Sequence, residues 1–231
     1  AEALVRWKHP QRGLLFPDTF IPLAERTGLI NQLTTWVVAD ALRQGQAFAA
    51  AGFPLELSVN LSARNLHDPG FSGLLLGLVG KAGFPLERLT LEITETAIMA
   101  DPGRAKAVLS ELRAAGIQLS MDDFGIGQSS LAYLKDLPIT KMKIDKSFVI
   151  GFDEPRNVAI VRSAIDLARN MQLNVTAEGI EDQATYEALR QLGCDLGQGY
   201  FISKPLSPDA FLSWLTSSAW SPRGEGFAIS P

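Results

Sequence analysis

The chain has 231 residues, of which 46% are hydrophobic and 20% charged, and its 21 basic and 25 acidic residues give a net charge of −4. A negative balance argues against a general nucleic-acid binder, so we expect no DNA partner, although it is compatible with a small nucleotide held through metal. The single cysteine, Cys194, excludes an internal disulfide, and no apolar run approaches the roughly 18 residues that span a bilayer. These properties predict a cytoplasmic protein, or the cytoplasmic portion of a larger membrane-anchored one.

Short β-rich runs and helical segments alternate along the chain. The strand runs are "LELSVNLS" from Leu55, "RLTLEIT" from Arg88, "IQLSMDD" from Ile117, "KMKIDKSF" from Lys141, "LNVTAEG" from Leu173 and "GYFIS" from Gly199. Apolar periodicity, capping residues and stop signals predict helices over 31–51, 101–116, 157–171 and 182–192, and a last helix that starts at Ser207. Strand and helix in alternation predict parallel βα units.

Six to seven such units favour a closed barrel over an open doubly wound sheet, because no glycine-rich phosphate turn follows the first strand. No linker or composition shift marks a second domain, so we expect one domain over residues 1–220 and a loosely docked tail over 221–231. The fold class predicted is α/β, a (β/α)8 barrel of the TIM type.

Several strand runs end in an acid or an amide, and in a barrel all strand ends of one polarity meet at one face. The residues concerned are Asn60, Glu92, Asp122, Asp123 and Glu178, with Glu2 on the opening strand. Five carboxylates and one amide in one pocket would require cations to offset their repulsion. Oxygen ligands without histidine indicate Mg²⁺ or Mn²⁺ rather than zinc, and two such metals are the common device for displacement at phosphorus.

Lys143 lies in "KMKID", where alternation directs Lys141, Lys143 and Asp145 to one face of a strand. A lysine in a barrel mouth needs anionic partners, and it could hold a nucleophilic water or neutralise a phosphorane-like charge. Taken singly, these residues also have structural interpretations: the two aspartates as turn formers, Asn60 as a cap and Lys143 as a surface lysine. Those interpretations leave the ordered placement at strand ends unexplained.

Seven motifs, in order and at the same spacing, make the chain resemble the EAL domain family of bacterial cyclic di-GMP phosphodiesterases. They are "EALVRW", "SVNLS", "LEITE", "DDFGIGQSS", "KMKIDKSF", "AEGIE" and "GQGYFISKP", and they cover Glu2 to about Leu215. The resemblance implies a modified barrel with one antiparallel strand. It also implies metal-dependent hydrolysis of cyclic di-GMP to linear pGpG, with Mg²⁺ or Mn²⁺ as cofactor and Ca²⁺ as an inhibitor of turnover.

The resemblance also implies a role for each matching residue. Glu2, Asn60, Glu92 and Asp122 resemble ligands of the first metal, Asp123 a ligand of the second, and Glu178 a further ligand or water-orienting base. Lys143 resembles the lysine near the attacking water and Gln198 a polar group beside it. Arg6 resembles the residue that meets a substrate phosphate, Asp145 is grouped with it as substrate-binding, and Glu95 resembles the anchor of the loop after Asp123.

The chain departs from the family pattern in two places. Family members carry a further strand ahead of the glutamate motif, so we expect that first strand to be missing from this chain. Ile126 and Gln128 also replace the threonine and tyrosine that the family usually has in the loop after the aspartates. The family implies a homodimer and an upstream sensory or diguanylate-cyclase-like domain.

Three other functions compete with an active phosphodiesterase. A catalytically weak domain could act as a cyclic di-GMP receptor, although all metal-site positions are retained here. A protein-interaction module would bind no nucleotide. A Schiff-base lyase would use Lys143 as its nucleophile.

Overall fold

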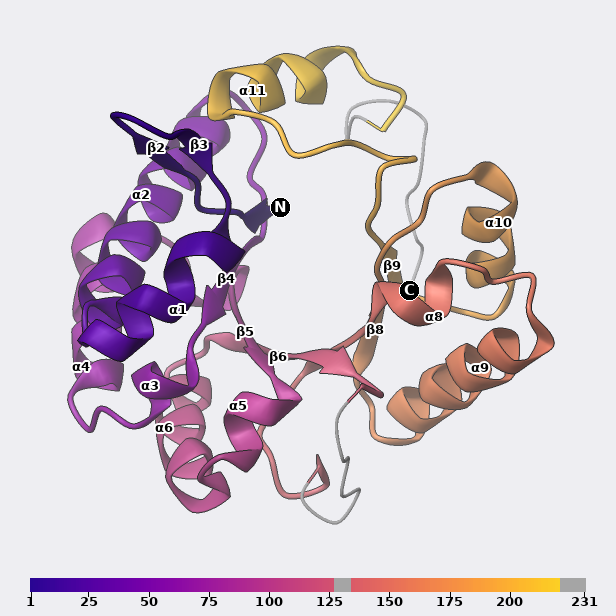
Figure 1. The fold of residues 1–231 in the computed structure, drawn as a ribbon, viewed down its shortest axis with the longest axis horizontal. Coiled ribbons are helices and arrows are strands. Elements are labelled where there is room, and N and C mark those ends of the chain that lie inside the picture. Colours follow the sequence, from indigo (N-terminus) through magenta and orange to yellow (C-terminus); the bar gives the residue numbers. More distant parts are fainter. Residues whose placement is uncertain (127–133, 221–231) are drawn as a thin grey trace. The chain divides into compact units, whose positions relative to one another are not determined.

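The structure is a computed structural model that describes residues 1–126 and 134–220, so the predictions about Gln128 and the 221–231 tail fall outside the described residues. The chain divides into two compact units. The first comprises Ala1–Leu119 and Asp136–Pro138, and the second comprises Ser120–Lys135 and Ile139–Pro231. In Figure 1 the ribbon colours follow the sequence, so the residues of each unit can be found from the colour bar.

The first unit has a parallel sheet in which β4 (Leu57–Leu61) lies between β1 (Glu2–Ala3) and β5 (Leu89–Thr94). The strands β2 (Trp7–His9) and β3 (Gly13–Leu15) form a separate antiparallel pair. Strand β5 ("LTLEIT") is apolar at every second position and buried at all positions but the last, as expected for a parallel strand covered on both faces.

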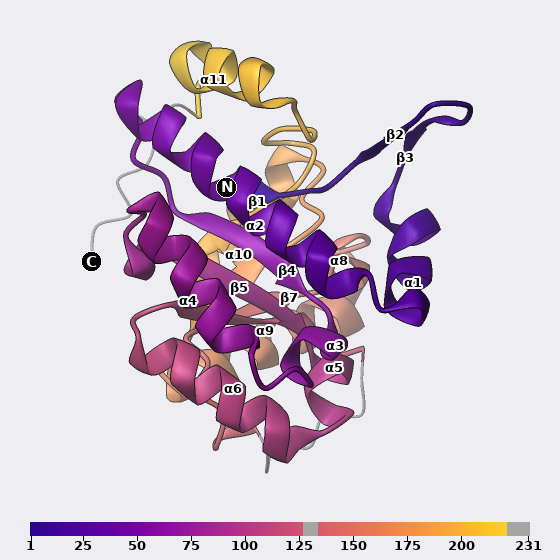
Figure 2. The same cartoon turned by 90° about the vertical axis from the view of Figure 1, so that its left-hand side faces the viewer.

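The helices of the first unit follow these strands. They are α1 (Pro17–Thr27), α2 (Ile30–Ala50), α3 (Ala63–Leu66), α4 (Phe71–Ala82), α5 (Glu95–Met99) and α6 (Pro102–Ala114), with the short 3₁₀ turn η1 (Leu86–Arg88) before β5. Figure 2 shows α2, α4 and α6 side by side over one face of β4 and β5. Helix α6 begins as its sequence predicts, because Asp101 accepts a hydrogen bond from the Arg104 amide ahead of the Pro102 turn.

The second unit is a parallel sheet in the order β6-β7-β8-β9. Its strands are β6 (Gln118–Phe124, whose first two residues belong to the first unit), β7 (Lys141–Ile144), β8 (Asn174–Ala177) and β9 (Leu196–Gly197). Its helices are α8 (Lys146–Val149), α9 (Pro155–Asn170), α10 (Gln183–Gln191) and α11 (Pro208–Ser217). In α9 the apolar stripe Val161, Ile165 and Ala168 is buried, which is why this sequence folds as a helix that packs on the sheet.

The predicted alternation of parallel strands and helices is confirmed in both units, and the antiparallel pairing is present in β2 and β3. One strand prediction is wrong. Residues 199–203 form a turn in which the Gly199 carbonyl accepts hydrogen bonds from the amides of Ile202 and Ser203, and the strand lies just before it, at β9. None of the helices within 1–126 and 134–220 has the length and hydropathy of a bilayer-spanning segment.

Candidate active site

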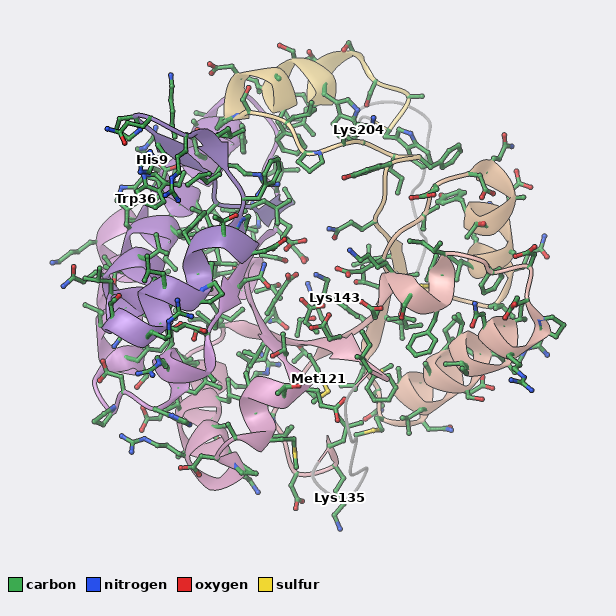
Figure 3. The ribbon with its side chains drawn as sticks, in the orientation of Figure 1. His9, Trp36, Met121, Lys135, Lys143 and Lys204 are labelled. Carbon is green, nitrogen blue, oxygen red and sulfur yellow. The ribbon has the colours of Figure 1, made fainter. Side chains whose placement is uncertain are left out.

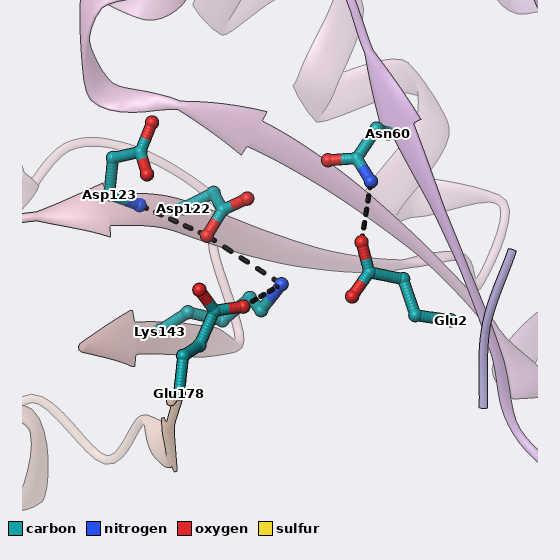
Figure 4. Close-up of polar contacts among 6 residues, drawn as sticks. All are labelled: Glu2, Asn60, Asp122, Asp123, Lys143 and Glu178. Carbon is teal, nitrogen blue, oxygen red and sulfur yellow. Dashed lines mark hydrogen bonds and ion pairs between the residues drawn. The ribbon is translucent and has the colours of Figure 1, made fainter. Parts of the chain in front are cut away.

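The first unit brings together three of the predicted site residues at the carboxyl ends of its parallel strands. Asn60 and Glu92 are register partners on β4 and β5, so their side chains leave the same face of the sheet. Glu92 is 4% exposed. The Asn60 side-chain amide donates a hydrogen bond of 2.7 Å to Glu2 Oε1, from the neighbouring strand β1 (Figure 4). Two carboxylates and an amide oxygen therefore meet at one end of this sheet.

A buried polar network, which the sequence analysis above does not predict, lies immediately after Asn60. Asn65 is 0% exposed, and its Oδ1 accepts hydrogen bonds from the Ser62 amide (2.9 Å) and the Thr34 hydroxyl (3.1 Å). The Ser62 hydroxyl donates to Glu25 Oε1 at 2.6 Å. The network thus fixes α1 and α2 to the residues that follow β4. The "Ser62-x-x-Asn65" spacing of a capping box was the available signal.

Arg6 and Glu95, also predicted from the sequence, lie in this unit. The Arg6 guanidinium stands 4.9 Å from the centre of the Phe16 ring and donates to the Val5 carbonyl. Glu95 is the first residue of α5 and is 5% exposed, while Thr94 caps that helix by accepting from the Ala97 amide. The loop that Glu95 is expected to anchor lies partly outside the described residues.

In the second unit, a β-bulge turns the aspartate pair at the end of β6. The register with β7 shifts between Met121 and Phe124, and Asp123 adopts a left-handed φ of 57°. Asparagine and aspartate tolerate this conformation better than other residues with a side chain. The backbone N–H of Asp123 donates to Asp122 Oδ1 at 3.0 Å (Figure 4). At the bulge the two carboxylates therefore point in different directions.

Lys143 is the central cation of this unit. Its side chain is 3% exposed, and its Nζ lies 2.5 Å from Glu178 Oε1 and 3.6 Å from Asp122 Oδ1 (Figure 4). Figure 3 shows Lys143 on β7 and Met121 on β6 extending to opposite sides of these strands, as their alternation predicts. A nearly buried ammonium between two carboxylates is a group whose charge is balanced locally.

Asp145 and Asp123 add to the negative charge around this lysine. Asp145 is 6% exposed and caps α8 by accepting from the Ser147 amide at 2.7 Å. Burial, together with repulsion from Asp122 and Asp145, raises the pKa of the Asp123 carboxyl, and Lys143 and Lys146 oppose that rise only in part. A carboxyl with a raised pKa beside a buried lysine is typical of a catalytic site.

Gln198 follows β9 and is joined to the end of β8. The backbone N–H of Gln198 donates to the Ala177 carbonyl at 2.8 Å. The backbone N–H of Glu178, the next residue after Ala177, donates to the Ile144 carbonyl at 3.1 Å. The strand ends of the second unit therefore carry Asp122, Lys143, Glu178 and Gln198 on four consecutive strands.

All the candidate donors are oxygen atoms, the type that Mg²⁺, Mn²⁺ and Ca²⁺ prefer. Within either unit, the residues that the structure describes include no group of three His, Cys, Asp or Glu side chains that could by itself hold a metal ion. The donor chemistry of each unit's strand ends fits a hard divalent cation.

Comparison with protein families identifies the family of this chain. The model of the EAL domain matches residues 1–205. The chain belongs to the EAL domain family. The fold agrees with this assignment, since the solved structure described as "PaMucR Phosphodiesterase, c-di-GMP complex" matches this EAL domain with a TM-score of 0.87 and 38% identity, over 91% of this chain and 86% of that one.

Two of the curated relatives that the chain resembles, both from Pseudomonas aeruginosa, are named as phosphodiesterases of cyclic di-GMP. Cyclic di-GMP phosphodiesterase PA2567 is 39% identical over 215 residues, which are 93% of this chain and 37% of that protein. Cyclic di-GMP phosphodiesterase NbdA is 42% identical over 207 residues, 89% of this chain and 26% of that protein. This EAL domain therefore spans about a third or less of the length of these relatives.

Proposed function

We propose that this EAL domain hydrolyses cyclic di-GMP to linear 5′-pGpG in a metal-dependent phosphodiesterase reaction. Support comes from the two relatives named cyclic di-GMP phosphodiesterases and from the likeness to a phosphodiesterase in complex with c-di-GMP. The observation that carries the proposal for this chain is the nearly buried Lys143 ammonium, paired with Glu178 and Asp122 at the ends of neighbouring strands.

In this proposal Lys143 is the cation that acts on the reacting phosphate. Glu178 holds its Nζ in place, so the ammonium needs little reorganisation when negative charge develops on the phosphoryl oxygens. Asp123 and Glu178 are the carboxylates that orient the attacking water and take its proton, and Gln198 donates or accepts a hydrogen bond beside them. Water supplies the oxygen that bonds to phosphorus, the bond from that phosphorus to the 3′ oxygen breaks, and the departing 3′ oxygen takes a proton to become a hydroxyl.

The ligands that we propose for divalent ions are drawn from the strand ends of each unit. They are Glu2, Asn60, Glu92, Asp122, Asp123 and Glu178. A bound Mg²⁺ or Mn²⁺ would polarise a phosphate oxygen and lower the pKa of a bound water toward neutrality. We propose two such ions, with Ca²⁺ as an inhibitor of turnover.

Substrate contacts are proposed for Arg6 and Asp145, and a loop-anchoring role for Glu95. The Arg6 guanidinium contacts the Phe16 ring and the Val5 carbonyl, and it is suited to a phosphate because it offers several N–H donors in one plane. Asp145 already uses one oxygen to cap α8, so its second oxygen is the one to meet substrate.

The test is incubation of the purified chain with cyclic di-GMP and Mn²⁺ or Mg²⁺, followed by chromatographic analysis of the nucleotides. Linear pGpG should form with wild type and with Glu87→Ala, which alters an exposed acid in the same unit as Glu2. Glu2→Ala should form at least about 100-fold less product, the order of loss when a catalytic interaction is removed. Binding of cyclic di-GMP without any product from wild type would contradict the proposal and favour a receptor.

The expected homodimer and the expected upstream sensory or cyclase-like domain stay predictions, as does the cytoplasmic location. The domain boundary at about residue 220 is also a proposal, compatible with the family match over residues 1–205. Sedimentation of the purified chain tests the dimer directly.

A further inference from the structure

Two loops of the second unit are paired along their backbones. The first loop, residues 178–181, follows β8, and the second loop, residues 198–203, follows β9. Three backbone hydrogen bonds join them and the end of β8: Gln198 N to Ala177 O at 2.8 Å, Ile180 N to Gln198 O at 3.1 Å, and Phe201 N to Ile180 O at 3.0 Å. Because the bonds bracket Ile180 on both sides, they hold its peptide groups against residues 198–201.

Gly199 is the residue that permits this pairing. A Cβ atom added at Gly199 would lie 2.1 Å from the Ile180 carbonyl oxygen, 2.3 Å from its nitrogen and 2.7 Å from its carbonyl carbon. These are backbone atoms, which cannot move aside as the end of a side chain can. Gly199 is not among the glycines with a left-handed φ, so the space available, rather than a special conformation, requires a glycine here.

An aromatic cluster packs around the far end of the second loop. The Phe201 ring lies 5.9 Å from Tyr186 of α10 and 5.7 Å from Trp220, and the latter two rings are 5.2 Å apart. The two contacts with Trp220 are edge-on, and such ring contacts add stability beyond simple burial. The second loop is therefore fixed at Gly199 by its backbone and at Phe201 by its side chain.

The first loop carries a group that is needed for the proposed reaction. Glu178 is two residues before Ile180 and pairs with Lys143 at 2.5 Å, while Gln198 immediately precedes Gly199. Any displacement of the 198–203 loop from Ile180 would thus move Gln198 relative to Glu178 and loosen the support of the Lys143 ammonium.

We propose that Gly199 is a positioning residue, which holds Gln198 at a fixed place relative to Glu178 and Lys143 by allowing the second loop to lie directly on the Ile180 peptide. This inference rests on the proposed phosphodiesterase function. Gly199 touches no reacting atom itself. It acts through the two loops.

The matched variants are Gly199→Ala and Gly197→Ala, in the full chain with Mn²⁺ and cyclic di-GMP. A Cβ at Gly197 would meet side-chain atoms and no backbone: the flexible end of Ile180 (Cδ1 at 2.7 Å), and, at ordinary contact distances, Ile202 Cδ1 (3.9 Å) and Tyr186 Cδ2 (4.0 Å), so this control should retain wild-type kinetics. Gly199→Ala should lower kcat at least about tenfold and leave KM within about threefold, because ångström-scale misplacement of reacting groups costs up to roughly 100-fold in rate.

Hydrogen–deuterium exchange supplies a measurement that does not depend on activity. The amides of Ile180 and Phe201 should exchange faster in Gly199→Ala than in wild type or Gly197→Ala, because both amides are donors in the loop pairing. Unchanged exchange at both amides, or an unchanged kcat in a turnover-competent background, would overturn the inference. Absence of turnover in wild type would instead overturn the proposed function and the positioning role with it, while the exchange would still report on the pairing.

A second variant decides the matter if Gly199→Ala does not fold. Phe201→Leu keeps an apolar side chain but removes the ring contacts with Tyr186 and Trp220. A kcat reduced about threefold or more with an unchanged KM would support the inference, and wild-type kinetics would overturn it.

Discussion

Lys143 Nζ lies 2.5 Å from Glu178 Oε1 although Lys143 is on β7 and Glu178 directly follows β8, and the lysine side chain is 3% exposed. The pair exists because β7 and β8 are adjacent and parallel, with Lys143 in register with Thr176, two residues before Glu178. Removing this buried ammonium by substitution therefore distinguishes a catalytic role of Lys143 from a structural one.

Lys143→Met should abolish cleavage of cyclic di-GMP while substrate affinity changes by less than about tenfold. Methionine keeps most of the apolar stem but removes the charge that offsets Glu178 and Asp122, so in metal-free buffer the free energy of unfolding should fall by about 1–3 kcal/mol. Urea denaturation and single-turnover assays measure the two effects.

Lys106→Met, on the exposed face of α6, is the control for Lys143→Met and should change neither quantity. Retention of full activity by Lys143→Met would show that the ammonium only supports the fold.

Asp123→Asn should raise the stability of the metal-free protein. Burial and the neighbouring carboxylates raise the pKa of Asp123 in the folded state, so folding binds a proton and stability declines as the pH rises from the ordinary value of 3.8 through the raised pKa. Asparagine carries no charge, so at neutral pH it removes the loss of stability that comes from a buried, charged Asp123 beside other carboxylates. It also tolerates the left-handed φ of 57°.

The measurement for Asp123→Asn is the urea midpoint at pH 7 with EDTA, with Asp153→Asn on the exposed surface as control. A lower midpoint for Asp123→Asn than for wild type would contradict the prediction. The same variant should lose turnover with Mn²⁺, since Asp123 is a proposed ligand of the second metal.

Much of the site was predictable because its residues coincide with strand ends. The alternation in "KMKID" predicts Lys141, Lys143 and Asp145 on one face; Lys143 and Asp145 are both buried, but Asp145 lies just past β7, where it caps α8. The structure also places Asn60 and Glu92 in register, as the barrel hypothesis required. The assignment of each residue to metal, water or substrate came only from the family resemblance and stays a prediction.

Other elements left weak signals in the sequence. Helix α4 was not predicted because "FSGLLLGLVGKA" is apolar on nearly all sides and contains three glycines, so it has little amphipathic period. Helix α1 contains Pro22, and β2 and β3 have three residues each, too few for a clear alternation. The apolar run 199–203 has β-rich composition, but backbone pairing with Ile180 folds it into a turn instead.

Asn65→Ala should destabilise the first unit by about 2–4 kcal/mol. The side chain is fully buried, accepts from the Ser62 amide and the Thr34 hydroxyl, and donates to Asn31 Oδ1 at 2.8 Å, so truncation leaves buried polar groups unsatisfied. Asn170→Ala, at the exposed end of α9, is the control and should cost less than about 0.5 kcal/mol. Urea denaturation measures both, and equal losses for the two variants would contradict the network's importance.

Thr185→Val should raise the pKa of Asp182 toward its ordinary value. The Asp182 carboxylate accepts hydrogen bonds from the Thr185 amide at 2.8 Å and the Thr185 hydroxyl at 3.0 Å, and these bonds favour the charged form and lower its pKa. Valine removes only the hydroxyl, so part of the lowering should persist through the amide. NMR titration of the Asp182 carboxyl carbon measures the pKa in wild type and in the variant.

The same titration predicts how the cap of α10 responds to acid. The pKa of Asp182 is lower in the folded protein than in the unfolded chain. The stabilisation by the charged cap is therefore complete above about pH 3.8, the ordinary pKa, and is lost as the pH falls through the pKa of the folded protein. Asp182→Asn caps comparably but does not titrate, so its stability relative to wild type should improve as the pH falls through this window. Thr216→Val, on α11, should leave the Asp182 titration unchanged. A titration of Asp182 at or above its ordinary value in wild type would show that the cap is not formed in solution.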